Sequence, residues 1–240
     1  MQFIPNLQVG FLVQRYKRFL SDIRLDDHSV ITAHCPNTGP MTGLIQVDAP
    51  VAFSVSNQKD RKLGYTLEMI RSEDTWVGAN TQNPNRLIKE AFSAGKIEAL
   101  LEYDTLRSEV KVLDSRIDFY ATQQNSPKKD GAQKDIYVEV KNVHLRRGYQ
   151  ALFPDTITTR GTRHLHTLRA LVAQGKRAML IYVVQRQDCQ SFAVAGDLDP
   201  DYALAFKQAM AAGVEFLAYS CEVSPQGINL GAPIPIQEPQ

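Results

Sequence analysis

Cysteine is scarce in this sequence, and its spacing builds no obvious site. The chain of 240 residues has three cysteines, Cys35, Cys189 and Cys221, and none of them forms a Cys-x-x-Cys pair. An odd number of widely spaced cysteines argues against a disulfide framework and gives no support for a zinc site. This usage is typical of a reducing compartment and predicts a cytoplasmic protein.

Long hydrophobic runs and familiar nucleotide motifs are also absent. No stretch approaches the roughly 20 apolar residues that a membrane-spanning helix needs. The first turns of the chain mix charges into an apolar pattern and lack the cleavage site of a secretory signal. We therefore expect no membrane partner. The sequence contains no Walker loop, no G-x-G-x-x-G and no G-x-S-x-G, so nucleotide-driven and serine-hydrolase chemistry have no support.

Charge is balanced over the whole chain but not along it. The formal net charge is +1, whereas the segment 141–177 holds eight Lys and Arg residues against one acid, Asp155. A basic block in a neutral chain predicts a surface that faces a polyanion. The alternative is a solvated basic face that acids from elsewhere in the chain balance.

Two regions differ in their residue patterns. Residues 1–80 read as short strands separated by Gly, Pro and Asn at regular spacing, which predicts a small β-barrel or sandwich. Helices and strands mix from residue 81 onward. A helix is expected over 83–95, where Asn83 can cap the first turn and Pro84 suits it. We predict a β-barrel domain over 1–80 and an α/β domain over 81–240.

The second region has two further helices and two loose segments in this interpretation. Apolar spacing predicts a basic helix over 158–175 and another helix over 201–213. The polar stretch 125–135 predicts a hairpin loop, and the Pro-rich end 231–240 predicts a loose tail.

Acids lie on three successive predicted strands of the second domain. Glu109 lies in "SEVKVL", Asp118 in "SRIDF", and Glu139 and Lys141 share one face of "YVEVK" because strand side chains alternate. Two carboxylates and a main-chain carbonyl make an oxygen site suited to Mg²⁺ or Mn²⁺. Such a metal polarises a phosphodiester and activates a bound water. A lysine beside it can orient or deprotonate that water, or offset charge on the phosphate.

The pattern Glu-x-Lys alone carries little information. Any half-exposed strand can hold such a surface ion pair, which is worth ~0–1 kcal/mol. Asp118 followed by a loop, by Glu139-x-Lys141 in the next strand and by a basic helix is more specific. This order favours metal-dependent phosphodiester chemistry.

Two basic clusters are candidates for nucleic-acid contact. Arg160, Arg163 and His164 lie off the apolar stripe of the predicted helix, and Arg160 and His164, four residues apart, share a face. A solvated helix face is the alternative. Arg15, Lys17 and Arg18 alternate with aromatics in "QRYKRF", a pattern suited to phosphate binding and base stacking by a strand. Here the alternative is a strand with its aromatics in the core and its cations in water.

Asp118, followed by Glu139-x-Lys141 in the next strand and then by a helix, looks like the core of PD-(D/E)xK nucleases. Further segments run in order along the whole chain: "LVQRYKRFL", "HCPNTGPMTG", "RKLGYTLEM", "NTQNPNRLIKEA", "LRSEVKV", "SRIDF", "YVEVKNV", "FPDTITTRGTRHLHTL" and "GVEFLAYSCEVS". Together these segments resemble the sugar fermentation stimulation protein family (SfsA). The resemblance implies an N-terminal OB-like barrel and a C-terminal PD-(D/E)xK-like mixed-sheet domain. It also implies DNA binding and an association with maltose-gene regulation in enteric bacteria.

Individual residues carry over with the motif. By resemblance, Asp118 and Glu139 fall on the metal-binding acids and Lys141 on the catalytic lysine. Glu109 or Glu90 would be the additional acid found in many such folds, and the sequence does not separate the two. Ile117 stands where the motif has proline, a position that varies across the superfamily.

These observations predict a cytoplasmic bacterial DNA-binding protein with a Mg²⁺- or Mn²⁺-dependent phosphodiesterase site, and they allow a homodimer. The alternative is a non-catalytic DNA-binding regulator that keeps the nuclease fold. A third option, suggested chiefly by the family's name, is an OB-type module that binds oligosaccharide.

Overall fold

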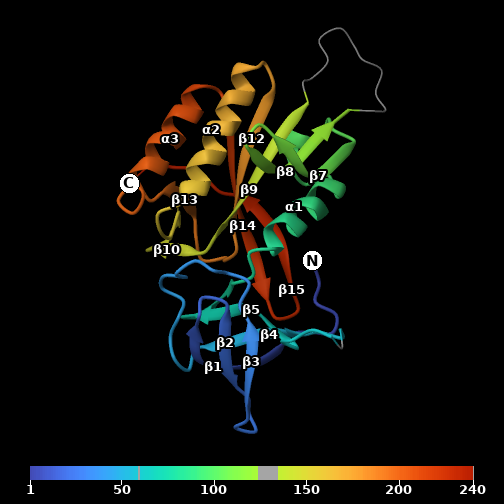
Figure 1. The fold of residues 1–240 in the computed structure, drawn as a ribbon, viewed down its shortest axis with the longest axis vertical. Coiled ribbons are helices and arrows are strands. Elements are labelled where there is room, and N and C mark those ends of the chain that lie inside the picture. Colours follow the sequence, from blue (N-terminus) through green and yellow to red (C-terminus); the bar gives the residue numbers. More distant parts are fainter. Residues whose placement is uncertain (59, 124–134, 240) are drawn as a thin grey trace.

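The protein consists of two bodies stacked along its longest axis (Figure 1). The structure is a computed structural model that describes residues 1–58, 60–123 and 135–239. Apart from Asp135, the predicted hairpin loop over 125–135 lies outside the described residues. None of the helices within these ranges is long and apolar enough to cross a membrane.

The first body is a closed barrel of five short strands. They are β1 (Gln8–Tyr16), β2 (Leu20–Arg24), β3 (Val30–His34), β4 (Pro50–Val55) and β5 (Tyr65–Ser72). Antiparallel pairing runs from β3 through β2, β1 and β4 to β5, and a short parallel pairing of β3 with β5 closes the ring. Strand β6 (Thr75–Gly78) pairs antiparallel with β5. The predicted OB-like barrel is confirmed.

The second body is built on a six-stranded mixed sheet with the order β15-β14-β12-β9-β8-β7. Its elements are α1 (Asn83–Ser93), β7 (Thr105–Val112), β8 (Ser115–Thr122), β9 (Ile136–Val143), α2 (Thr159–Ala173), β12 (Arg177–Val184), α3 (Pro200–Ala211), β14 (Glu215–Ser224) and β15 (Gly227–Pro233). A 3-10 turn, η1 (Glu98–Leu100), follows α1. A small second sheet, absent from the sequence prediction, pairs β10 (Leu145–Arg147), β11 (Gln150–Phe153) and β13 (Ser191–Val194).

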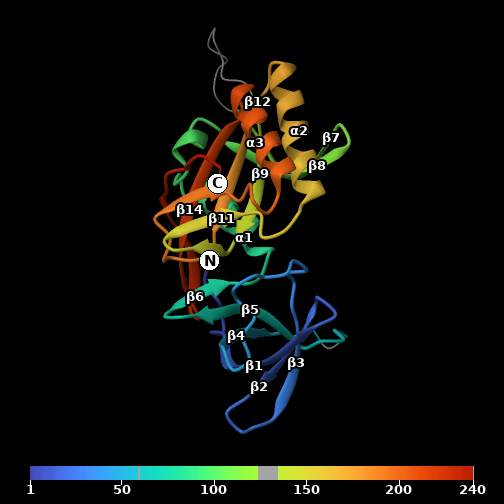
Figure 2. The ribbon, with the colours of Figure 1, turned by 90° about the vertical axis from the view of Figure 1, so that its left-hand side faces the viewer.

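Helices cover both faces of the large sheet. Helix α1 lies on one face, and α2 and α3 lie side by side on the other (Figures 1 and 2). The central strand β12 is therefore apolar at almost every position, as expected for a parallel strand buried on both sides. Met179 and Ile181 join the core beneath α1, whereas Leu180 and Tyr182 join the core beneath α2 and α3.

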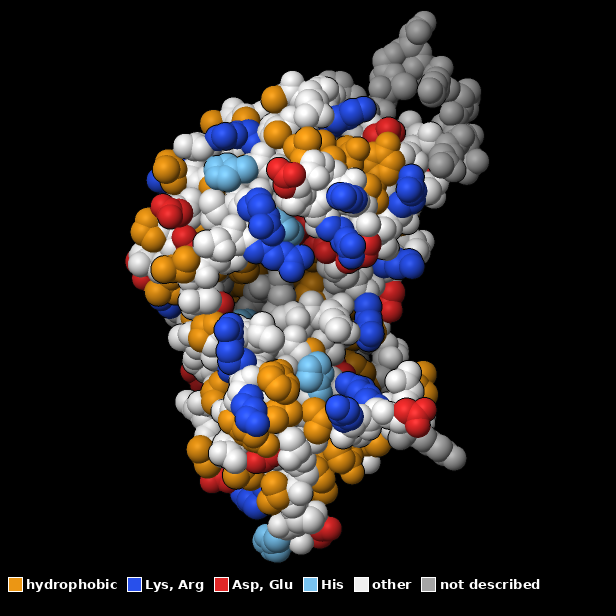
Figure 3. Space-filling model, viewed as in Figure 1, with side chains coloured by type: hydrophobic (Ala, Val, Ile, Leu, Met, Phe, Trp, Pro, Cys, Tyr) orange, Lys and Arg blue, Asp and Glu red, His pale blue; other side chains and the backbone are white. Residues whose placement is uncertain are grey.

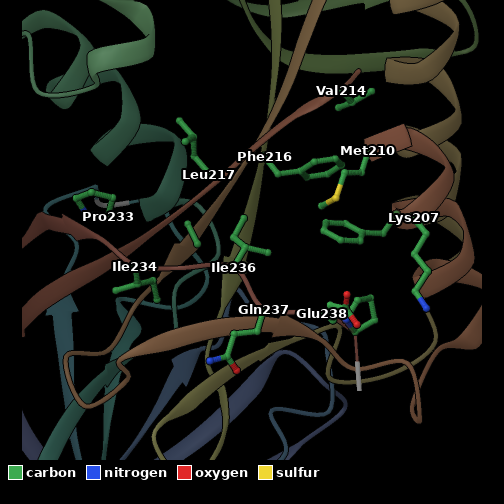
Figure 4. A pocket seen from close by; sticks show the side chains of 13 residues that line it. Lys207, Met210, Val214, Phe216, Leu217, Pro233, Ile234, Ile236, Gln237 and Glu238 are labelled. Atoms are coloured by element: carbon green, nitrogen blue, oxygen red, sulfur yellow. The ribbon is translucent and has the colours of Figure 1, made fainter. Parts of the chain in front are cut away.

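The C-terminal segment is packed, so the prediction of a loose tail was wrong. The Ile234 amide donates to the Ala218 carbonyl at 2.8 Å, and Ile236 bridges to Phe192 of β13. Its isoleucines alternate with prolines and bury part of their surface against the α3 side of the sheet. An apolar pocket of about 670 Å³ remains between this segment and α3 (Figure 4).

Polar contacts seat the barrel against the end of the sheet. The Gly78 amide donates to the Gln185 carbonyl at 2.8 Å, and Gln185 Nε2 donates to Asn142 Oδ1 at 2.6 Å and to the Asn80 carbonyl at 3.1 Å. A Cβ atom on Gly78 would lie 2.4 Å from Gln185 Oε1, so only glycine allows this approach. The barrel thus meets β9 one residue beyond Lys141.

Candidate functional site

The site forms where strands β8 and β9 separate. Their pairing ends at Phe119 and Val138, and Asp118 is the next residue of β8. In place of a ladder hydrogen bond, the Val140 amide donates to Asp118 Oδ2 at 2.8 Å. Asn85 of α1 donates to Asp118 Oδ1 at 2.8 Å. The carboxylate of Asp118 therefore closes the gap and is held from two sides.

Glu139 lies on the face of β9 beneath α2 and is 2% exposed. Its Oε1 accepts a hydrogen bond from Lys141 Nζ at 2.6 Å and also contacts His164 Nδ1 of α2. Its Oε2 is buried and has no hydrogen-bond partner among the residues that the structure describes. A buried carboxylate oxygen without a partner is costly, so it calls for a ligand.

The surroundings of Asp118 and Glu139 shift their pKa values in opposite directions. Burial, and then the charge of Glu139, raise the pKa of Asp118 from 3.8 to about 6. Burial also acts to raise the pKa of Glu139, but the Lys141 ammonium and His164 outweigh it and hold that pKa below its usual value. Two neighbouring carboxyls with pKa values pushed in opposite directions are characteristic of functional sites.

The donor set fits a divalent cation. Asp118 and Glu139 bring two carboxylates together, one with a bare buried oxygen, and a cation between such groups would relieve their repulsion. No group of three or more His, Cys, Asp or Glu side chains in the described ranges is arranged to hold a metal. The remaining ligands would be water, a main-chain carbonyl or substrate phosphate, a mixture that Mg²⁺ accepts.

Neither candidate for an additional acid contacts this cluster through a bond that the structure describes. Glu109 lies opposite Asp118 in the register of β7 and β8, at a position where the two strands are not paired, and it has φ 58° and is exposed. Its carboxylate pairs with Arg116 at 3.4 Å. Glu90 on α1 pairs with the Met1 ammonium at 2.7 Å. The role of an additional acid stays a prediction. Of the two candidates, Glu109 lies on the strand next to that of Asp118, opposite it in the register.

Helix α2 places its predicted residues on two different sides. Arg160 and Arg163 are exposed, and neither has an acidic partner in the described part of the chain. His164 is 2% exposed and faces the sheet, and Thr167 is likewise buried and bonds Ser115 at 2.8 Å. The spacing rule assigned only apolar residues to the buried side. The sheet below α2 carries polar groups as well, so polar helix residues turn inward.

Besides Lys141, three of the eight cations of the basic block are paired with acids from outside it. The pairs are Arg146 with Glu73 and Asp188, Arg147 with Asp197, and Arg177 with Glu215. The balanced-face alternative therefore accounts for these cations. Of the remaining cations, Arg160 and Arg163 lie on α2 close to His164, which contacts Glu139, and they are the part of the block suited to phosphate.

Of the N-terminal cations, Arg15 lies near the end of β1, and Lys17 and Arg18 lie in the turn between β1 and β2. Arg15 Nη2 donates to the carbonyls of Asn37 and Gly39 at 2.7 and 2.8 Å, and Arg18 Nε donates to that of Thr38 at 2.8 Å. Lys17 is exposed at the turn itself. Arg15 and Arg18 thus brace the loop "PNTGPMTG", whatever else they bind.

This loop faces the second domain across a hollow. The Met41 amide donates to Asp155 Oδ2 at 3.2 Å, and Asp155 lies in the segment that leads into α2. Lys and Arg side chains line both sides of the hollow between the two bodies (Figure 3). The loop and the start of α2 therefore border one basic concave surface.

Two residues of the site were missed from the sequence. Asn85 holds Asp118 from α1, and its only signal was a polar residue beside the apolar stripe of "NPNRLIKEA". Gln185 ties the barrel to the strand end beside Lys141. Both act through contacts between residues far apart in the chain, and their local sequence gives no sign of them.

The fold and site define a class of protein: an OB-type barrel joined to a mixed-sheet domain with an acidic cluster at a strand gap. The family model "Sugar fermentation stimulation protein RE domain" matches residues 82–227, and "SfsA N-terminal OB domain" matches 13–79. The chain belongs to the sugar fermentation stimulation protein family.

Relatives agree along the full length. A "Sugar fermentation stimulation protein homolog" of Rhodospirillum centenum is 47% identical over 96% of this chain and 97% of its own. The homologue of Paramagnetospirillum magneticum is 43% identical over 98% and 97%. The solved structure "Pyrococcus Furiosus SfsA in complex with Ca2+" shares the fold with a TM-score of 0.87 at 23% identity, covering 99% of this chain and 98% of that one.

Proposed function

We propose that this protein binds DNA and carries a divalent-metal-dependent phosphodiesterase site. The observation that carries the proposal is the buried Oε2 of Glu139, which lies beside Asp118 and Lys141 and has no hydrogen-bond partner among the described residues. In this proposal Asp118 and Glu139 hold Mg²⁺ or Mn²⁺. The Ca²⁺ named with the Pyrococcus structure supports a divalent cation in the family fold.

The chain's own residues supply binding and proton control. The cation, when bound, would polarise the phosphate and lower the pKa of a bound water. Lys141 donates one of its three N–H groups to Glu139, which leaves two to donate to the phosphate or to orient the water. Arg160 and Arg163, exposed at the start of α2, would bind the phosphate backbone on the adjoining surface.

A second function, DNA binding without cleavage, is favoured by one feature. Lys141 and Glu139 neutralise each other within the site, so their charges are compensated without a metal. A regulator of gene expression could keep such a pair for stability. A link to maltose genes follows from the family resemblance alone, and no contact in the structure bears on it.

The decisive experiment separates these functions. The protein is incubated with linear, circular and single-stranded DNA in Mg²⁺, Mn²⁺ or EDTA, beside Asp118→Ala and Lys141→Ala. Lys207→Ala, an exposed change on α3, serves as the control. Metal-dependent cutting that both site variants lose and the control keeps supports the enzyme.

The binding half of the proposal has its own readout. Binding without cutting under every condition would favour the regulator. Affinity that falls steeply with salt indicates phosphate contacts, because bound cations release counterions from the DNA. Failure to bind any form of DNA would remove both functions.

A further inference from the structure

We propose that His164 is a positioning residue of the site: it holds Glu139 by Oε1 and so leaves Oε2 as the oxygen available to the cation. The role rests on the proposed function. This role differs from the phosphate contact predicted for this histidine, because the side chain of His164 is buried between α2 and the sheet and does not reach solvent. Arg160 and Arg163 keep that predicted contact.

The acceptor beside His164 requires a proton on its Nδ1 atom. An ionised glutamate only accepts hydrogen bonds, so the contact between His164 Nδ1 and Glu139 Oε1 requires a proton on Nδ1. Lys141 Nζ, which only donates, approaches the same Oε1 at 2.6 Å and lies 3.2 Å from Nδ1. Two N–H groups, one from the histidine and one from the lysine, therefore converge on a single carboxylate oxygen.

The other ring nitrogen is also engaged. Arg160 Nε lies 3.5 Å from His164 Nε2, an approach that the four-residue spacing on one helix makes available. A guanidinium only donates, so Nε2 is the acceptor. Both ring nitrogens therefore have partners among the described residues, Nδ1 at Glu139 and Nε2 at Arg160.

This arrangement explains why the two oxygens of Glu139 differ. The carboxylate can rotate about its terminal bond, and Lys141 alone, on a flexible stem from the same strand, would follow it. His164 approaches from a different element and fixes which oxygen faces the protein. Oε2 then stays buried and free of a described partner. Partners of this kind typically contribute about 10- to 100-fold to metal affinity.

The test measures cation affinity in the full-length protein without DNA. Calorimetry with Ca²⁺ and with Mn²⁺ compares the unsubstituted protein with His164→Ala, His164→Asn and His166→Ala. His166 is an exposed residue of the same helix and is the control. We expect His164→Ala to weaken binding by about 10- to 100-fold. His164→Asn should restore most of the affinity, because the asparagine amide can place an N–H where Nδ1–H was.

A second readout does not depend on the metal. Nuclear magnetic resonance of isotope-labelled histidine reports which ring nitrogen carries the proton. A proton on Nδ1 in the unsubstituted protein supports the proposal, and a ring that carries its proton on Nε2 alone overturns it.

The outcomes separate the two proposals. Unchanged affinity in a folded His164→Ala variant, or an asparagine variant as weak as the alanine one, would overturn the positioning role alone. If the unsubstituted protein bound neither Ca²⁺ nor Mn²⁺, the proposed function would fail and the positioning role with it.

Discussion

The barrel and the sheet domain each bury a glutamate, and the two carboxylates are treated differently. Glu68 of β5 is 6% exposed, and both its oxygens are bonded. Ser54 donates to Oε1 at 2.8 Å, and Asn80 and Asn83 donate to Oε2 at 2.8 and 3.4 Å. Glu139 has charged and histidine partners crowded on one oxygen and none described on the other.

The contrast separates a structural carboxylate from one arranged for a ligand. Neutral donors on both oxygens of Glu68 complete its hydrogen bonding and tie the barrel to the start of α1. Both described partners of Glu139 contact Oε1, so Oε2 is buried without a hydrogen bond from the described residues and would need a ligand to supply one. Burial alone would not distinguish them, because both side chains are almost fully covered.

The largest expected effect is on cation binding and DNA cleavage, which depend on Glu139 and not on Glu68. Glu139→Gln removes the charge while keeping the shape, so we expect cation binding and any DNA cleavage to fall at least about 100-fold. Glu68→Gln should leave both unchanged. Calorimetric titration with Mn²⁺ and a plasmid-cleavage assay check this, and a Glu68→Gln variant that lost cation binding would erase the distinction.

The next effect is on the free energy of unfolding, to which the hydrogen bonds of Glu68 contribute. Glu68→Ala strands the Asn80 and Asn83 amides, so we expect the free energy of unfolding to fall by about 3 kcal/mol. Glu68→Gln should cost less, because its amide can donate to the Ser54 hydroxyl while its carbonyl accepts from Asn80. Urea unfolding measures both, and equal losses in the two variants would argue against these hydrogen bonds.

A smaller effect follows from the pKa of Asp118. The pKa of Asp118 is about 6 in the folded protein, whereas the ordinary pKa of an aspartate in an unfolded chain is 3.8. The contribution of Asp118 to stability is therefore fully present below the unfolded pKa and is lost as the pH rises through the folded one. We expect a loss of about 2 kcal/mol in the metal-free protein across that window.

Comparison with Asp118→Asn isolates this contribution. Urea unfolding in EDTA from about pH 4 to pH 7 should show a steeper decline for the unsubstituted protein than for the variant. Identical slopes would mean that Asp118 is not held protonated by its surroundings.

The smallest effect extends the comparison from carboxylates to cations. Arg147 is paired with Asp197 at 2.7 Å, whereas Arg163 is exposed without a described acidic partner. Arg163→Ala should weaken DNA binding by a few-fold and reduce the dependence on salt by about one counterion. Arg147→Ala should change neither. Fluorescence anisotropy over a series of salt concentrations measures both, and equal effects would show that ion pairing does not decide which cations meet DNA.

Local patterns predicted much of the architecture. The short strands of the barrel and the three helices follow from turn residues and from apolar spacing, which depend on neighbours in the chain. The same holds for Glu139 and Lys141 on one face of β9. The C-terminal segment was the failure, since its prolines suggested a tail while its isoleucines pack against β13 and β14.

The candidate site was predicted as a set of residues but not as an arrangement. The order β9-β8-β7 makes the three acid-bearing strands neighbours, which was not predicted from the sequence. Nothing in the local sequence indicates that β8 and β9 separate at Asp118, or that Asn85 of α1 contacts Asp118 there. Such contacts join segments dozens of residues apart, and no local periodicity encodes them.

The sequence by itself determined the chemistry available here: two acids and a lysine at strand spacing, a basic helix after them, and a barrel before them. Only the tertiary structure decided how that chemistry is used. Because α2 packs over β9, Glu139 is buried and His164 points toward the sheet, and Glu139 Oε2 has no hydrogen-bond partner among the described residues. The reason is that a side chain's partners, and so its charge and hydrogen bonding, depend on which distant elements pack over it.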